Sequence, residues 1–176
     1  CLDLGDAPPG YCSTAGAGSF RAWFGLGRAL EGLGQTEEAE AAYCRALQAN
    51  PAFHAPLYPL ARLLRHRLGP RPAAQQLESF FDLSRPAHRL LLADLLLAVG
   101  EYPLALEYLE PLPPSGPEGA RAAYLRGWCL AHLGRYAEAE SWWRLLPPQS
   151  PYYLPALTWR YLLAAKQGRT AEAEKL

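Results

Sequence analysis

The sequence lacks several features that common functional classes require. It has no excess charge, because 17 Lys and Arg balance 17 Asp and Glu, whereas nucleic-acid-binding domains usually show a basic excess. No stretch approaches the ~20 consecutive apolar residues of a membrane-spanning helix, and no secretory signal opens the chain. We therefore expect neither a nucleic-acid partner nor a membrane span.

The four cysteines do not form the pattern of a metal site. Cys1, Cys12, Cys44 and Cys129 are irregularly spaced and include no C-x2-C pair, whereas zinc needs clustered ligands. Cys44 and Cys129 fall within expected helices, where a free thiol packs as a small apolar side chain. This usage predicts no bound metal and favours a reducing, cytoplasmic setting.

Motifs for catalysis and cofactor binding are also missing. There is no G-x4-G-K-[ST] phosphate loop, no H-E-x2-H metal motif and no G-x-S-x-G nucleophile elbow. Gly16-Ala17-Gly18 lacks the preceding strand that a dinucleotide fingerprint needs. Acidic pairs such as Glu37 and Glu38 lie at expected helix starts, where the helix dipole favours them. We therefore expect no catalytic residue and no cofactor within the chain.

The sequence does contain a repeated helical hairpin, which is clearest over residues 20–53. Trp23, Leu26, Gly27 and Leu30 follow one another at i, i+3, i+4 and i+7. This spacing places all four on one face of a helix. Gly34 comes next and ends that helix.

A second helical stripe follows, formed by Ala39, Tyr43 and Ala46 and ended by Pro51. Together with Gly27, the two alanines leave room for the two helices to approach closely. The large ring of Tyr43 fills the space beside them. The pattern therefore predicts a tightly packed pair of helices.

The hairpin recurs along the chain in a fixed register. Gly100, Gly134 and Gly168 are 34 residues apart, and Gly34 precedes Gly100 by 66. Such a register predicts units that cannot bury their apolar faces alone and must stack on one another. We divide the chain into a lead-in segment, 1–19, and a repeat domain, 20–176, with the repeats 20–53, 54–85, 86–119, 120–153 and the incomplete 154–176.

The second repeat departs most from the pattern. We expect its first helix over residues 53–66, with Pro59 kinking the helix or delaying its start. The Gly- and Pro-rich residues 69–72 predict the turn that follows.

The motif Trp23-x2-Leu26-Gly27-x2-Leu30, then Ala39-x3-Tyr43-x2-Ala46 and Pro51, resembles the tetratricopeptide repeat. The resemblance implies an all-α fold, an α-solenoid built as a right-handed superhelix of about four and a half helical hairpins. It also implies that the first helix of each hairpin lines a concave groove that binds a peptide or protein partner.

On this stacking, cationic and aromatic side chains dominate the groove and favour an extended, acidic or amphipathic peptide. The predicted groove residues are Arg21, Phe24, Arg28, Tyr58, Arg62, Arg65, His66, Asp94, Arg121, Tyr124, Trp128, His132 and Lys166. The alternative is a solvated helix face without a ligand, since charged residues cover any solenoid surface.

Some tetratricopeptide repeat domains bind chaperone C-termini through a clamp of Lys, Asn and Arg. The corresponding positions here are Phe24, Arg28, Pro59, Ala87 and Leu91, of which only Arg28 is suitable. A chaperone-tail adaptor is therefore not expected.

Two interpretations of function stay open. The first is a non-catalytic interaction module, with self-association as a further possibility. In the second, residues 2–9 and 19–23 resemble a junction in bacterial family 2 glycosyltransferases, whose nucleotide-sugar-binding domain precedes such repeats. Because the chain starts without Met and ends at Leu176 inside an expected helix, we expect it to be part of a longer protein. Whether that protein is an enzyme is left open.

Overall fold

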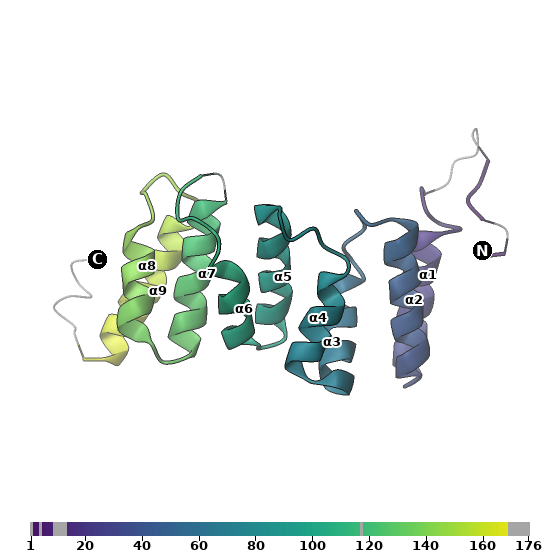
Figure 1. Cartoon of the computed structure of the whole chain (residues 1–176), viewed down its shortest axis with the longest axis horizontal. Coiled ribbons are helices and arrows are strands. Elements are labelled where there is room, and N and C mark those ends of the chain that lie inside the picture. Colours follow the sequence, from purple (N-terminus) through teal and green to yellow (C-terminus); the bar gives the residue numbers. More distant parts are fainter. Residues whose placement is uncertain (1, 4, 9–13, 117, 169–176) are drawn as a thin grey trace. The chain divides into compact units, whose positions relative to one another are not determined.

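The computed structural model describes residues 2–3, 5–8, 14–116 and 118–168, and within them all regular structure is helical. This confirms the all-α prediction. The helices form two compact units, Cys1–Phe80 and Phe81–Leu176, which we describe separately. The described helices are α1 (Phe20–Gly32), α2 (Thr36–Ala49), α3 (Leu57–Leu68), α4 (Pro70–Glu78), α5 (Pro86–Ala98), α6 (Tyr102–Leu109), α7 (Gly119–His132), α8 (Tyr136–Arg144) and α9 (Tyr153–Lys166) (Figure 1).

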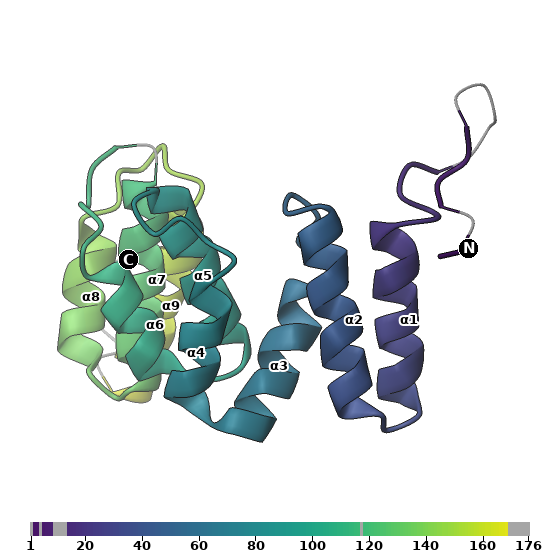
Figure 2. The same ribbon diagram turned by 45° about the vertical axis from the view of Figure 1, so that its right-hand side comes forward.

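In the first unit, α1 and α2 lie side by side and antiparallel (Figure 2). Their contact forms around Gly27 and Tyr43, which is fully buried. A Cβ atom placed on Gly27 would lie 2.6 Å from the Tyr43 ring. The small residue is therefore needed for this helix contact, as the sequence pattern predicts.

In the second hairpin, two observed helix boundaries differ from the expected ones. Its first helix, α3, starts at Leu57 rather than at residue 53, with Pro59 in its first turn, where the missing N–H of proline is tolerated. The turn is Gly69 alone, with φ +82°, and α4 starts at Pro70. Proline suits the first position of a helix because its φ is already helical and its N–H is not needed there. The expected turn over 69–72 is therefore wrong.

Four glycines end the first helices of the hairpins, in the predicted register. Gly34, Gly100, Gly134 and Gly168 have φ angles of 77°, 82°, 77° and 72°. Residues other than glycine rarely adopt this left-handed backbone conformation. The 34-residue spacing thus reflects one recurring turn, although the exact limits of the repeats stay a prediction.

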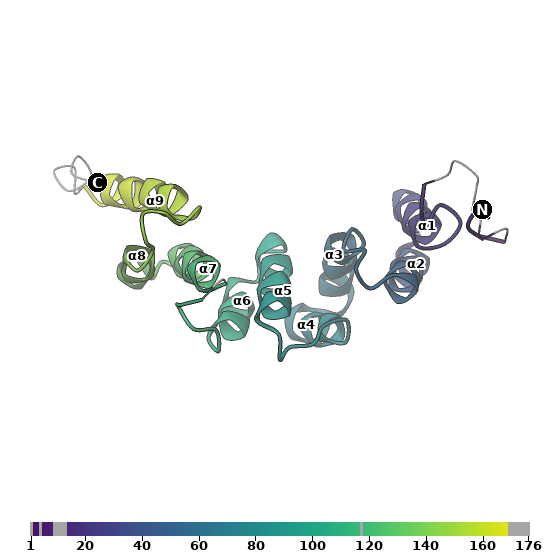
Figure 3. The same cartoon turned by 90° about the horizontal axis from the view of Figure 1, so that it is seen from above.

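In the second unit, α5, α7 and α9 follow one another on one side, and α6 and α8 lie on the other (Figure 3). We call these the inner and outer sides of this unit. Its core contains Trp143, which is 1% exposed, packed with Ala139 of the same helix and with Leu130 and Leu163 of its neighbours. This ring fixes α8 against α7 and α9.

The described part of the lead-in segment is not helical before α1, but it is tied to the start of that helix. The Asp6 carboxylate accepts hydrogen bonds from the Gly18 amide at 2.7 Å and the Ser19 hydroxyl at 2.9 Å. Arg21 of α1 donates to the Ala15 carbonyl at 2.8 Å. The described residues 5–8 and 14–19 are therefore connected to the first hairpin through specific polar contacts.

Candidate functional site

A row of aromatic rings lies on the inner side of the second unit. Tyr124, Trp128 and His132 are spaced at i, i+4 and i+8 on α7, so their side chains share one face of the helix. The ring centroids of Tyr124 and Trp128 are 5.9 Å apart, and those of Trp128 and His132 are 6.1 Å apart. The tyrosine and tryptophan are half-buried and the histidine is exposed.

Three further rings from neighbouring segments extend this row. Tyr102, at the start of α6, stacks on His132 with centroids 4.4 Å apart and planes 3° from parallel. Tyr152 lies 5.5 Å from Tyr124, and Trp159 of α9 lies 6.1 Å from Trp128. We define these six residues as the aromatic face: Tyr102, Tyr124, Trp128, His132, Tyr152 and Trp159.

The core holds the aromatic face in place from below. The Trp143 indole N–H donates to the Tyr124 carbonyl at 3.1 Å, and the Trp143 ring stacks on Trp159 at 6.4 Å. Burial raises the pKa of the Tyr124 phenol, against the opposing effect of a hydrogen bond from Trp159. The phenol is therefore neutral near pH 7.

Two pockets open beside the stacked pair of Tyr102 and His132. One, the Trp128 pocket, has a volume of about 220 Å³. The other, the Lys166 pocket, has a volume of about 310 Å³. The Trp128 pocket is lined by Asp94, Leu97, Ala98, Tyr102, Leu125 and Trp128. The Lys166 pocket is lined by Ala131, His132, Tyr136, Trp159, Leu162, Leu163 and Lys166.

The two pockets differ in charge. In the first, Asp94 of α5 forms an ion pair with Arg121 of α7, so its charge is balanced. In the second, the described lining includes the Lys166 ammonium, whose Nζ lies 5.6 Å from the Tyr136 ring and 3.4 Å from its hydroxyl, and includes no carboxylate. The Lys166 pocket therefore has an unbalanced positive charge beside aromatic walls.

The structure brings together six of the predicted groove residues on this inner side. They are Asp94, Arg121, Tyr124, Trp128, His132 and Lys166. Three members of the aromatic face were not predicted: Tyr102, Tyr152 and Trp159. Trp159 precedes the predicted groove residue Lys166 by seven positions on α9, so helical spacing was the signal that could have found it.

The predicted groove residues of the first unit have other partners. Phe24 is half-buried, with its ring 5.9 Å from Tyr43 and 5.6 Å from Phe53. The guanidinium of Arg21 lies 5.5 Å from the Phe53 ring. Arg62 of α3 forms an ion pair with Glu31 of α1. These contacts neutralise or cover part of the expected cationic surface.

The other predicted positions of this unit are exposed side chains: Arg28, Tyr58, Arg65 and His66.

The described residues contain no group of three or more His, Cys, Asp or Glu side chains that could hold a metal ion. None of the helices that the structure describes is both long and apolar enough to cross a bilayer.

Comparison with solved structures shows the fold. The crystal structure of MamA is 21% identical in sequence with a TM-score of 0.53, and the match covers 85% of this chain and 89% of MamA. MamA from Desulfovibrio magneticus RS-1, residues 41 to the end, is 16% identical with a TM-score of 0.53, and the match covers 89% of both chains. No curated protein sequence matches.

Two parts of the sequence match family models. Both models are of the tetratricopeptide repeat, one over residues 20–53 and the other over residues 90–153. Together the matches take in more than half of the 176 residues, and they agree with the paired helices and recurring glycine turns. The chain is a tetratricopeptide repeat protein.

Proposed function

We propose that the chain is an interaction module that binds an extended peptide segment of a partner protein across the aromatic face. The observation that carries this proposal is the continuous row of aromatic rings, half-buried except for the exposed His132, with pockets beside the Tyr102–His132 stack. Aromatic rings provide a large contact area at low cost in conformational entropy and are enriched in interface hot spots.

The chemistry of the pockets suggests which peptide binds. The Trp128 pocket is apolar apart from the paired Asp94, so it suits a large uncharged side chain. The Lys166 pocket combines a cation that pairs with no carboxylate of the described residues with the rings of Trp159 and Tyr136, so it suits an acidic side chain beside an apolar one. We therefore expect a segment in which an acidic residue is close to large apolar residues.

Selection from a displayed library of random peptides on the full chain tests this proposal. Selected peptides should be rich in large apolar residues with a nearby Asp or Glu. Trp128→Ala should weaken their binding at least about tenfold, the effect typical of an interface hot spot. The control is Tyr161→Ala, which removes a ring of α9 that is 49% exposed and lines neither pocket.

The charge preference has its own test. Lys166→Glu should weaken acidic peptides and strengthen the same peptides with Lys in place of the acidic residue. If no peptide is selected, or if Trp128→Ala binds as tightly as the control, the inner-side site is ruled out. If Trp128→Ala is impaired but the charge swap has no effect, the acidic preference alone is wrong.

A second candidate is that the chain forms the C-terminal region of a bacterial family 2 glycosyltransferase. It is supported only by the resemblance of the lead-in segment, part of which Asp6 ties to α1. The test is the gene sequence upstream of Cys1, followed by nucleotide-sugar turnover by the full-length protein. Further helical repeats upstream, in place of alternating strands and helices with a paired-Asp motif, would exclude this candidate. A cytoplasmic location also stays a prediction.

A further inference from the structure

Arg126 of α7 is a buried charge on the outer side of the second unit. Its side chain is 3% exposed, the lowest value for any charged residue that the structure describes. The Nη2 atom donates to the carbonyls of Leu109, Glu110 and Leu112 at 2.5, 3.0 and 2.5 Å. Its guanidinium carbon lies 4.3 Å from the centre of the Trp142 ring. One nitrogen therefore caps three carbonyls at and just after the end of α6, where helical donors run out; the Leu109 carbonyl also accepts from the Leu112 N–H at 2.9 Å.

The other two guanidinium nitrogens are not used in this way. Nε and Nη1 of Arg126 donate to no acceptor among the described residues. Both atoms keep some exposure to solvent. In the described chain, one side-chain N or O atom is fully buried without a hydrogen-bond partner, and that atom is Arg160 Nε. Burial lowers the pKa of Arg126, and the nearby charge of Glu110 opposes this shift. Arginine stays protonated even so, so both atoms remain donors.

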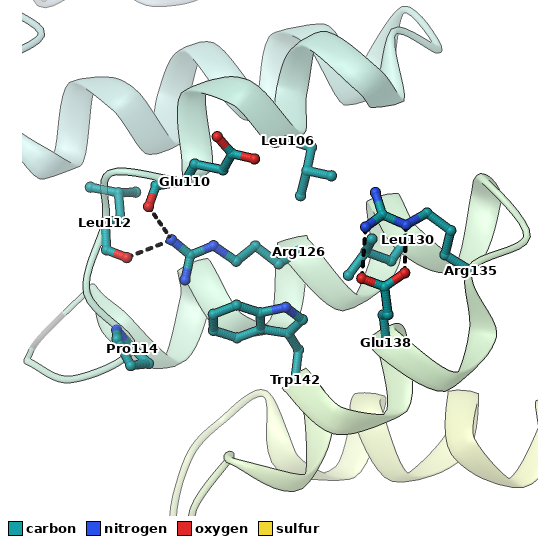
Figure 4. A pocket seen from close by; sticks show the side chains of 9 residues that line it. All are labelled: Leu106, Glu110, Leu112, Pro114, Arg126, Leu130, Arg135, Glu138 and Trp142. Atoms are coloured by element: carbon teal, nitrogen blue, oxygen red, sulfur yellow. Dashed lines mark hydrogen bonds and ion pairs between the residues drawn. The ribbon is translucent and has the colours of Figure 1, made fainter.

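These donors border a pocket of about 400 Å³, the Arg126 pocket (Figure 4). Leu106, Leu130 and Trp142 supply apolar walls. The Glu110 carboxylate also lines the pocket and accepts no hydrogen bond from the residues the structure describes. The pocket thus offers an apolar surface together with unused donors and an unused acceptor.

The charges around this pocket balance. Arg135 and Glu138 pair with each other through two hydrogen bonds, of 2.7 and 2.6 Å, and Glu110 is near Arg126. A free anion would be repelled by Glu110, and a free cation by Arg126. A neutral amide, in contrast, has a carbonyl that can accept from Arg126 and an N–H that can donate to Glu110.

We propose that the Arg126 pocket is a second binding site, which takes an uncharged aliphatic residue of a partner polypeptide. The aliphatic side chain packs against Leu106, Leu130 and Trp142, and the backbone amide of that residue bonds Arg126 and Glu110. The ligand carbonyl gains most at Arg126, because a poorly hydrated donor without an acceptor is costly. This site is separate from the aromatic face and does not depend on the function proposed for that face.

Three small probes with one side chain test the proposal on the full chain. N-acetyl-L-leucinamide is neutral, N-acetyl-L-leucine carries a carboxylate and L-leucinamide carries an ammonium. Binding is followed through the indole N–H signals in nuclear magnetic resonance spectra, with the Trp142 signal identified by Trp142→Phe. We expect the neutral probe to shift the Trp142 signal but not that of Trp128, with an affinity at least about threefold above that of either charged probe.

A second measurement removes the Glu110 carboxylate, the acceptor in the pocket, while Arg126 stays in place. Glu110→Ala should weaken the neutral probe about threefold to tenfold, the effect of one lost hydrogen bond. Glu107→Ala, which removes an exposed carboxylate of α6 outside the pocket, should leave it unchanged. No saturable shift of the Trp142 signal, a preference for a charged probe, or equal binding by both variants would each overturn the proposal.

Discussion

Gly127 lies directly against the indole ring of Trp143: a Cβ atom at position 127 would be 2.2 Å from the Trp143 Nε1 atom. Gly27 has the same relationship to Tyr43, three hairpins earlier in the pattern and in the other unit. Neither glycine has a left-handed φ angle. Both are glycine because a large ring on the partner helix occupies the space of a side chain.

Adding a methyl group at either position should therefore destabilise the unit that contains it. We expect Gly27→Ala and Gly127→Ala to lower the free energy of unfolding by about 1–3 kcal/mol, because the rings must shift. Urea titration followed by circular dichroism measures this change. The control is Gly25→Ala in the same helix as Gly27, where a Cβ atom meets nothing within 4 Å. That change should stabilise α1 by about 0.5–1 kcal/mol, and an equal loss in Gly25→Ala and Gly27→Ala would contradict the packing explanation.

Arg126→Met keeps a long side chain but removes the donor to three carbonyls. We expect a loss of roughly 3 kcal/mol in the second unit, since the carbonyls of Glu110 and Leu112 lose a charged donor, whereas that of Leu109 keeps the Leu112 N–H. Urea titration with the near-ultraviolet signal of the tryptophans reports on it. Arg135→Met breaks an exposed ion pair instead and should change stability little. Similar curves for the two variants would show that Arg126 does not stabilise the end of α6.

The Asp94 carboxyl should give stability a specific dependence on pH. Burial raises its pKa above the ordinary 3.8, by more than the ion pair and hydrogen bond with Arg121 lower it. Between 3.8 and the raised value the folded state holds more protons than the unfolded state, so stability contributed by this group falls as pH rises. In Asp94→Asn, the free energy of unfolding measured across that pH range should lack this decrease with rising pH. Parallel pH profiles for both proteins would exclude the effect.

Cys129 should resist alkylation in the folded protein. Burial raises the pKa of its thiol to about 12, so almost no reactive thiolate exists near neutral pH. Cys44 also has a raised pKa, caused by burial and by the charge of Glu40, but it is only half-buried. Peptide mass spectrometry after brief iodoacetamide treatment should show Cys44 labelled before Cys129. Equal labelling of Cys129 in native buffer and in urea would refute this.

The sequence was sufficient to predict the hairpin register because the physical causes are local. Gly34, Gly100, Gly134 and Gly168 mark one turn type, and Gly27 and Gly127 mark close helix contacts. The second hairpin was harder, because proline near a helix start can either delay the helix or begin it. Its boundaries depend on packing around Leu57 and Leu60, which periodicity does not specify.

The candidate sites were only partly predictable for a related reason. The stripe Tyr124, Trp128 and His132 follows from helical spacing, whereas Tyr102 joins it from a helix start that the repeat pattern treats as a turn. Arg126 carried a signal that went unused. It occupies the position of Leu26 in the repeat motif, on the helix face that the motif predicts to be apolar, so a charge there indicated a polar contact.

Arg160 lies at the same position one repeat later. Its side chain is 15% exposed and its Nε atom lies 3.9 Å from the Glu140 carboxylate, close enough for ion pairing but too long for a hydrogen bond. The arginines at this position in the two successive repeats therefore have different surroundings. Which carbonyl or carboxylate an arginine meets depends on the neighbouring helix, and the repeat motif does not encode this.

The three carbonyls held by Arg126 also limit how this protein can be cut or rearranged. A side chain from α7 caps the end of α6, so the hairpin of α5 and α6 depends on the hairpin that follows for these hydrogen bonds. A fragment that stops before α7 would leave those carbonyls to solvent, and a shuffled array would offer them Leu or another side chain without a donor. The repeats of this chain are therefore ordered parts of one assembly and not interchangeable modules.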